Sequence, residues 1–541
     1  MEGHSLPSTA GPWSEAELLH MLEGVVPTSP TSHKVYEYIA EKLSAEPDFV
    51  MSSNLAMTFD VTTAFEMYAH TNEVFDDEHF WVHGFNDRAK FLDVAWHLWS
   101  TDSIYIYFDA VLLMNSLGNH HNSAGGNYLY KNAFVTNAPF LPPADFGADG
   151  DFTFPYRSFG SFGSDHWNLS IGRDRFSWGP GRSGNFMLGS HFIQHDYLKF
   201  TTFHNRFKYT LLASFFPPDA TMGKDQNAEF PGFTMFLGHR IEFSFLKDKF
   251  GLALSESITY KTEENTLNLA AINPFGFFHN EYIRGLANSL ITVEVDVNPF
   301  GYVDYYAQLA IDEISLGEES QPNPGAYPNA MGYMVGARAA FPVRGGIVAE
   351  ASLEAALTDP FLYLRGLDGV SDGSGVGGYS HGYGHDAIVK NFNKPGDYKR
   401  MFLGYEYGGD AIVLHYASSL ESFGHWSVFC NAMYMWHGNK RLDSQWSAYG
   451  KNGQNDLITI LSGDVIERTL ILSVGGKLNV PKVPGMYVKA GLDYVNIVNM
   501  KSKTPTVFTA VHYGDSVDLY LNEQGSNHAD IQMNFCIGYS F

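Results

Sequence analysis

The sequence predicts an all-β transmembrane barrel of about 18 antiparallel strands, with a short N-terminal helical segment and long extracellular loops. The 541 residues are 15% aromatic and only 17% charged, yet their mean hydropathy is −0.16. Many segments alternate between apolar and polar residues, and short and long connections separate them in turn. A barrel reconciles these observations, because only every second residue of each strand faces lipid.

The composition excludes several other classes of protein. No apolar run approaches the roughly 20 residues that a membrane-spanning helix needs. The net charge of −25 argues against nucleic acid as a partner. The first residues lack a basic region followed by an apolar core, so we expect that an export signal has been removed. The two cysteines allow one disulfide, but their spacing does not establish it.

The alternation is clearest in residues 291–298, 302–312, 347–358 and 486–494. Successive side chains of a strand point to opposite faces, so this pattern is typical of a wall between lipid and an aqueous lumen. It places Leu353 toward lipid and Glu354 toward the lumen. We therefore expect Leu353→Arg to be far more damaging than Glu354→Gln. Strands of a soluble β-sandwich also alternate, but they usually run only about five to six residues.

The strand count follows from the connections. Both ends of a bacterial barrel normally lie in the periplasm, so short turns and long outer loops must alternate. The alternation fails only in 116–165, and one more strand over 151–162 restores it. Residues 405–418 must then form a single long strand. These choices predict eighteen strands in residues 51–541, which form the barrel.

Residues 1–50 form a separate helical segment. Ser14 and Glu17 have the spacing of a capping box, and Leu18, Leu19 and Leu22 follow on one helical stripe. Residues 32–43 are predicted to form a second helix. This segment is expected either in the periplasm against the barrel mouth or inside the barrel as a plug.

The last predicted strand carries an apolar face that ends on an aromatic residue. Its alternate positions from Ile531 onward are apolar, and the series finishes with Ile537, Tyr539 and Phe541. A closing amphipathic strand of this kind looks like the signal that the outer-membrane insertion machinery reads. We therefore assign Ile537, Tyr539 and Phe541 to assembly.

Three segments resemble the Wzi-type capsule-assembly barrels. The first is 167–190, where a Gly172-Arg173 pair precedes a Trp178-Gly179-Pro180-Gly181 turn, and the others are 273–282 and 403–410. The resemblance implies a protein of the cell outer membrane that holds capsular or related surface polysaccharide as a lectin, without catalysis and without a cofactor. The implied partners are outer-membrane lipid and lipopolysaccharide, surface polysaccharide and, during biogenesis, the insertion machinery.

The same segments contain the side chains that a sugar requires. Flat aromatic rings contact sugar C–H faces, and planar charged groups bind hydroxyls and carboxylates. We expect these residues in outer loops around the strand ends. The candidate polysaccharide-binding residues are Arg173, Asp174, Trp178, Arg182, His279, Asn280, Glu281 and Tyr282.

Structural roles are alternatives for the same residues. The Trp178-Gly179-Pro180-Gly181 segment is also suited to a tight turn, and Arg173 with Asp174 to an ion pair that stiffens the lumen. The histidines of 366–399 lack carboxylate or thiol support for a metal, so we expect them at the surface of an outer loop and expect no metal site.

The main functional alternative is a porin or substrate-specific channel for small solutes. A barrel of about eighteen strands is wide enough for an aqueous pore unless loops fill it. Inward Glu294, Asp296, Glu350 and Glu354 would favour cations or neutral sugars. No nucleophile setting is recognisable, so we expect no enzyme. A lumen filled by loops would favour the polysaccharide receptor, and an open lumen would favour the channel.

Overall fold

The computed structural model describes most of the chain. The described residues are 1–75, 81–84, 87–114, 134–138, 150–153, 156–192, 194–218, 231–262, 265–267, 276–278, 287–314, 328–343, 345–364, 384–391, 397–442, 459–504, 519–522 and 524–541.

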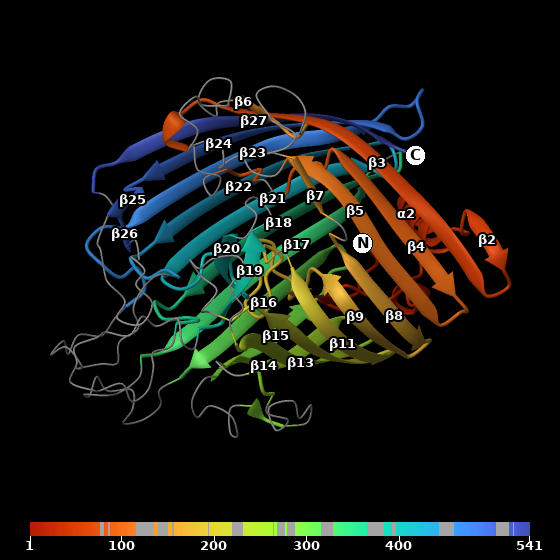
Figure 1. The fold of residues 1–541 in the computed structure, drawn as a ribbon, viewed down its shortest axis with the longest axis horizontal. Coiled ribbons are helices and arrows are strands. Elements are labelled where there is room, and N and C mark those ends of the chain that lie inside the picture. Colours follow the sequence, from red (N-terminus) through yellow and green to blue (C-terminus); the bar gives the residue numbers. More distant parts are fainter. Residues whose placement is uncertain are drawn as a thin grey trace.

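Eighteen antiparallel strands close into a barrel (Figure 1), as predicted. The barrel closes where β27 pairs with β3, from Gln532 opposite His70 to Ser540 opposite Thr62. Its strands are β3 (Leu55–His70), β4 (Leu92–Ser100), β5 (Ile104–Met114), β7 (Gly150–Thr153) with β8 (Ser158–Ser164), β9 (Trp167–Asp174), β11 (His195–His204), β12 (Phe207–Phe216), β13 (Phe233–Phe245), β14 (Phe250–Thr262), β15 (Ala287–Val297), β16 (Val303–Glu313), β17 (Ala330–Val343), β18 (Ile347–Thr358), β21 (Ala411–Ser422), β22 (Trp426–His437), β23 (Glu467–Asn479), β24 (Met486–Val498) and β27 (Asn527–Ser540).

The strand that parity required in 151–162 is present. It consists of two pieces, β7 and β8. Both pair with β5, so together they count as one of the eighteen strands. The prediction of a single strand over 405–418 is wrong, because β21 begins only at Ala411. Gly408 and Asp410 both have positive φ, at 67° and 63°, and this turns the preceding residues away from the strand direction.

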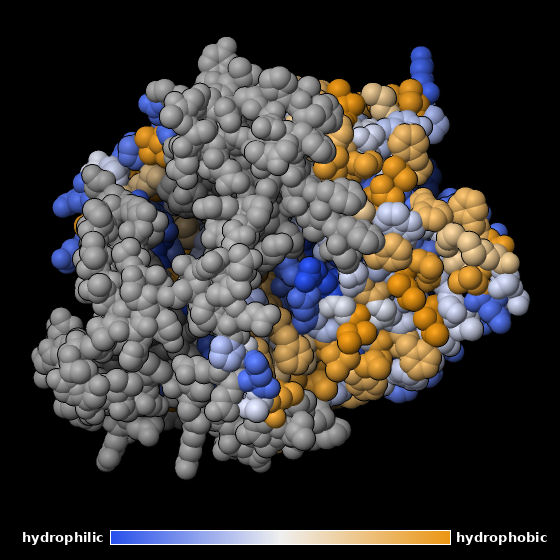
Figure 2. Space-filling view, viewed as in Figure 1, coloured by the Kyte–Doolittle hydropathy of each residue, from blue (hydrophilic) through white to orange (hydrophobic). Residues whose placement is uncertain are grey.

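The barrel is apolar outside and carries polar side chains inside, as the alternation predicted, and apolar side chains such as Phe236 also face the lumen. Leu353 on β18 is 64% exposed, whereas the next residue, Glu354, is 2% exposed. Figure 2 shows the apolar side chains gathered over the strands on the right of the view. A closed wall leaves no unpaired strand edge in lipid, so the exterior satisfies both demands of a bilayer. The chain is therefore an outer-membrane barrel.

Both cysteines, exposed Cys430 and buried Cys536, are free. No described helix is both long and apolar enough to cross a membrane. The remaining elements are β1 (Ala10–Gly11), α1 (Glu15–Glu23), α2 (Pro30–Leu43), β2 (Phe49–Ser52), the 3-10 helix η1 (Glu73–Phe75), β6 (Phe134–Thr136), β10 (Ser177–Trp178), β19 (Asp386–Asn391), β20 (Asp397–Phe402), β25 (Lys501–Thr504) and β26 (Leu519–Asn522).

The two N-terminal helices begin at side-chain caps. The Ser14 hydroxyl accepts a hydrogen bond from the Glu17 N–H, and Ser29 forms a capping box with Ser32. Helix α2 lies at the short-turn end of the barrel. Its Thr31 hydroxyl donates to the Val343 carbonyl at 3.0 Å, and its Tyr38 ring packs on Phe423 with centroids 5.7 Å apart.

The residues before α1 enter the lumen as an extended segment, 5–12, which we call the N-terminal strap. The Thr9 N–H donates to Glu242 on β13 at 3.0 Å, and the Leu6 N–H donates to Asp296 on β15 at 3.0 Å. Strand β1 of the strap pairs with β10, so Ala10 lies opposite Trp178. The strap therefore joins the barrel wall to the segment that follows β9.

The closing strand allows a test of the assembly assignment, which stays a prediction. Ile537 is 39% exposed and Phe541 is 74% exposed, while the Tyr539 and Phe541 rings pack with centroids 4.6 Å apart. Phe541→Glu should lower the level of folded barrel in outer membranes severalfold, whereas Phe541→Tyr should not. Immunoblots with a heat-modifiability gel would measure this, and equal levels of the two variants would contradict the assignment.

Candidate functional site

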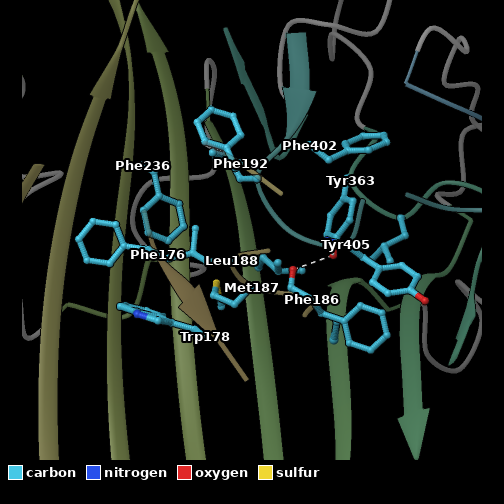
Figure 3. Close-up of a cluster of buried hydrophobic side chains, with 14 of the residues drawn as sticks. Phe176, Trp178, Phe186, Met187, Leu188, Phe192, Phe236, Tyr363, Phe402 and Tyr405 are labelled. Atoms are coloured by element: carbon cyan, nitrogen blue, oxygen red, sulfur yellow. Dashed lines mark hydrogen bonds between the residues drawn. The ribbon is translucent and has the colours of Figure 1, made fainter. Parts of the chain in front are cut away.

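Two connections that parity assigns to the outer side fold back into the lumen. Their described residues 175–192, 359–364, 384–389 and 402–410 form an apolar cluster with the inner faces of the wall, and we call them the plug. Figure 3 shows Phe186, Tyr363 and Tyr405 side by side, with Trp178 and Phe236 packed at the other end. Trp178, Phe186, Leu188, Tyr363 and Tyr405 are all 0% exposed.

Hydrogen bonds join the two plug connections. The Tyr363 hydroxyl donates to the Phe186 carbonyl at 2.6 Å and accepts from the Tyr405 N–H at 2.9 Å (Figure 3). The Gly189 N–H donates to the Leu403 carbonyl at 2.8 Å. Because a buried polar group without a partner costs free energy, these hydrogen bonds help to hold the two connections together as a packed structure.

The wall holds the plug through inward carboxylate and amide groups. Glu354 on β18 accepts hydrogen bonds from the Arg182 N–H at 2.8 Å and from the Ser183 N–H at 2.9 Å. It also accepts from the Ser183 hydroxyl and, at 2.6 Å, from the Tyr306 hydroxyl. Gln308 on β16 donates to Asn185 at 2.6 Å. These are polar positions that the alternation placed in the lumen, and the plug occupies them.

His385 is the centre of a further plug contact, and the expectation that it lies at the surface is wrong. Its side chain is 0% exposed, and Nε2 lies 2.8 Å from the Met187 carbonyl. A carbonyl only accepts, so Nε2 carries the proton and Nδ1 accepts from the Thr259 hydroxyl at 3.1 Å. Burial lowers the pKa of His385 to about 4.

The lowered pKa predicts an acid-sensitive plug. The folded protein favours neutral His385, so its contribution to stability is complete above the ordinary pKa of 6.5 and is lost as the pH falls toward 4. We expect the melting temperature in detergent to fall over this window and to fall less in His385→Gln. Asp359, whose pKa burial raises to about 6, has the opposite pH dependence, so the comparison of variants isolates His385. Parallel curves for the two proteins would contradict this.

Trp178 cannot act as the predicted sugar-stacking face. It is 0% exposed, and its ring packs at 6.3 Å from Phe236 of β13 in a T-shaped arrangement. The prediction placed it in an outer loop, but its loop turns into the lumen and pairs with the N-terminal strap. Trp178 is therefore part of the plug core.

Arg173 and Asp174 do not form one lumenal ion pair, because they point to opposite faces of β9. Arg173 faces outward and pairs with Asp196 on β11 at 2.7 Å. Asp174 is buried inside and accepts from Arg157 at 2.8 Å. Both therefore have structural partners: Asp196 lies on β11, and Arg157 lies directly before β8.

Arg182 is the predicted sugar-binding residue that remains open to the lumen. Its side chain is 47% exposed and lies 3.9 Å from Glu350, while its backbone N–H is held by Glu354. The predicted residues His279, Asn280, Glu281 and Tyr282 lie outside the described part of the chain. The structure thus brings Arg182 and Asp174 to the lumen and directs Arg173 outward.

A cavity of about 960 Å³ lies beside the plug. The inner faces of β3, β4, β24 and β27 line one side, and the N-terminal strap and residues 175–182 line the other. Trp13, Tyr156 and Tyr487 contribute aromatic rings, and Asp174 and Arg182 also lie on its wall.

Cations outnumber carboxylates on the cavity wall. The carboxylates are Glu66, Asp87, Asp93 and Asp174. The cations are Arg88, Lys90, Arg157, Arg175, Arg182, Arg338 and Lys489. Sequence reasoning missed most of these residues. The alternation along its strand could have shown that Lys489 points into the lumen. The sequence near each segment does not show, however, that residues 6–13, 175–182 and 487–489 come together around one cavity. Within the described ranges, no group of His, Cys, Asp or Glu side chains is arranged to hold a metal ion.

The fold and the lumen define the class: an outer-membrane β-barrel whose interior is occupied by its own loops, with a cation-lined cavity beside them. Searches with family models and among curated proteins found no match. Among solved structures, the chain is similar to Wzi of Escherichia coli, an outer-membrane protein involved in group 1 capsule assembly and described as a carbohydrate-binding β-barrel. The TM-score is 0.52 at 14% identity over 99% of this chain and 94% of Wzi.

More distant similarities are to other outer-membrane barrels. OprD of Pseudomonas aeruginosa has a TM-score of 0.41 at 8% identity, over 90% of this chain and 95% of that chain. OmpT of Vibrio cholerae has a TM-score of 0.33 at 8% identity, over 91% and 100%. The resemblance to Wzi-type barrels that the sequence indicated is thus confirmed as a shared fold.

Proposed function

We propose that this protein binds and anchors surface polysaccharide at the outer membrane as a plugged, non-catalytic receptor. The observation that carries the proposal is the filled lumen. In an open pore the inward carboxylates would meet water, yet Glu294, Asp296 and Glu354 are 4%, 7% and 2% exposed. Each has a partner inside the protein: Arg240, the Leu6 N–H and the plug backbone, respectively.

Further support comes from the fold and from the charges that the lumen retains. Wzi, whose fold this chain shares, is described as carbohydrate-binding. Arg182 keeps a half-exposed guanidinium beside the cavity, and Trp13, which lines the same cavity, is 41% exposed. Arginine and aromatic rings provide the planar donors and flat faces that sugars require.

A solute-specific channel is the second candidate, and the cavity beside the plug favours it. The experiment compares two readouts of the intact protein. In planar bilayers the purified barrel should be electrically silent, and in encapsulated cells its loss should release polysaccharide into the medium while total polysaccharide stays constant. Steady conductance together with unchanged retention would overturn the receptor and support the channel.

A further inference from the structure

We propose that the lumenal cavity is an anionic-sugar site, which binds carboxylate-bearing units of an acidic glycan. This inference rests on the proposed function and adds to it the binding site and the chemical class of the ligand. Neither the sequence motif around Trp178 nor the outer face of the barrel supplies such a site, because Trp178 is buried and Arg173 is paired with Asp196.

The first argument is charge. The chain carries a net charge of −25, yet the cavity wall has more cations than carboxylates. Cations gathered in a concave, low-dielectric surface raise the local concentration of anions. A cation-rich cavity inside an acidic protein therefore selects a ligand of negative charge.

The second argument is that the cavity cations are not all neutralised. Arg157 is satisfied by Asp174 at 2.8 Å. Within the described part of the chain, in contrast, neither the Arg175 guanidinium nor the Lys489 ammonium forms an ion pair, since Asp174 contacts Arg175 only through its backbone N–H at 2.8 Å, and both residues line the cavity. Lys489 is exposed on the inner face of β24, in phase with inward Asp493. These two side chains are available to a carboxylate ligand.

The third argument is the pairing of aromatic rings with cations. The Lys489 Nζ lies 5.3 Å from the centre of the Tyr487 ring, and the Lys90 Nζ lies 4.6 Å from that of Tyr156. Trp13 adds a 41% exposed indole from the opposite, strap-bearing side. A free inorganic anion needs only the cations, whereas a sugar acid uses both the cations and the rings.

Size limits the ligand. Small-molecule sites usually measure about 300 to 1,000 Å³, and the cavity of about 960 Å³ is at the upper end of that range. It has room for a short oligosaccharide segment or chain end, and not for a folded polymer. Oligosaccharides of three units are therefore suitable probes.

The test is calorimetric titration of the full-length barrel in a neutral detergent with trigalacturonate, with maltotriose as the neutral probe and inorganic phosphate as the simple anion. Wild type should bind trigalacturonate in preference to both. Replacing Arg175 and Lys489 together with glutamine should weaken that binding at least about tenfold, because it removes two charge-assisted contacts and the loss of one already costs about tenfold. Lys482→Gln, which makes the same charge change in the exposed turn before β24, should leave it unchanged.

The outcomes separate this inference from the proposed function. Equal binding of trigalacturonate and maltotriose, or unchanged affinity in the double variant, would overturn the anionic-sugar site even if cells retain polysaccharide. Phosphate binding as tight as trigalacturonate would reduce the cavity to a simple anion site and also overturn it. If the double variant fails to assemble, two other titrations test the site: trigalacturonate binding to Lys489→Gln, and trigalacturonate binding to wild type in added salt. A site that depends on charge must bind trigalacturonate more weakly in both. Loss of polysaccharide retention is read separately and tests the proposed function.

Discussion

Replacing Glu354 with alanine should release the plug and make the barrel conduct ions. The carboxylate accepts from the Arg182 N–H, the Ser183 N–H and hydroxyl, and the Tyr306 hydroxyl. The variant leaves these donors without an acceptor in a buried site, and each such donor costs about 1 to 3 kcal/mol. The loss is several times larger than a typical surface substitution. Conductance in planar bilayers and thermal unfolding in detergent would measure the two consequences.

Glu350→Ala is the matched control, since Glu350 lies two inward positions earlier on β18 and is half exposed. It lies 3.9 Å from Arg182 and so has only a weak, solvent-screened pair to lose. It should therefore remain silent and nearly as stable as wild type. A Glu354→Ala barrel that is equally silent and equally stable would show that the plug does not depend on this carboxylate.

Leu353→Arg should destabilise the barrel by about 2 to 4 kcal/mol, the cost of a cation on the lipid face near the middle of the bilayer. Leu353 is 64% exposed on the outer face, with Ala337 and Tyr416 as its neighbours on the adjoining strands. Leu353→Phe keeps an apolar side chain at the same place and should be nearly neutral. Urea titrations in lipid vesicles would compare the two, and equal midpoints would mean that this face does not contact lipid.

The sequence suggested that Glu354→Gln would do little damage compared with Leu353→Arg, but the structure predicts a larger effect for Glu354→Gln. The alternation correctly places Glu354 in the lumen, but it treats the lumen as water, where a neutral side chain would only tune polarity. The Arg182 and Ser183 N–H groups donate to different oxygens of Glu354, so glutamine retains an acceptor for one of them and turns an NH₂ group toward the other. Glu354→Gln is therefore expected to weaken the plug, with a loss smaller than that of Glu354→Ala.

The sequence by itself determined the barrel. A period of two is a local property, so Leu353 and Glu354 receive opposite faces from their own neighbours alone. The count of eighteen strands follows from the alternation of turns, and it even required the interrupted strand of β7 and β8. The cap at Ser14 is local in the same way.

Only the tertiary structure decided what fills the barrel. Residues 175–192 form a connection on the outer side by parity, and nothing within them shows whether such a connection extends outward or turns inward. That choice depends on partners far along the chain: Trp178 meets Phe236, Ser183 meets Glu354, and His385 meets Met187. A strand's period is set by neighbouring residues, whereas the burial of a loop is set by the apolar surface and hydrogen-bond acceptors that distant segments present to it. For that reason the sequence identified Arg182 as a candidate but not the cavity that it lines.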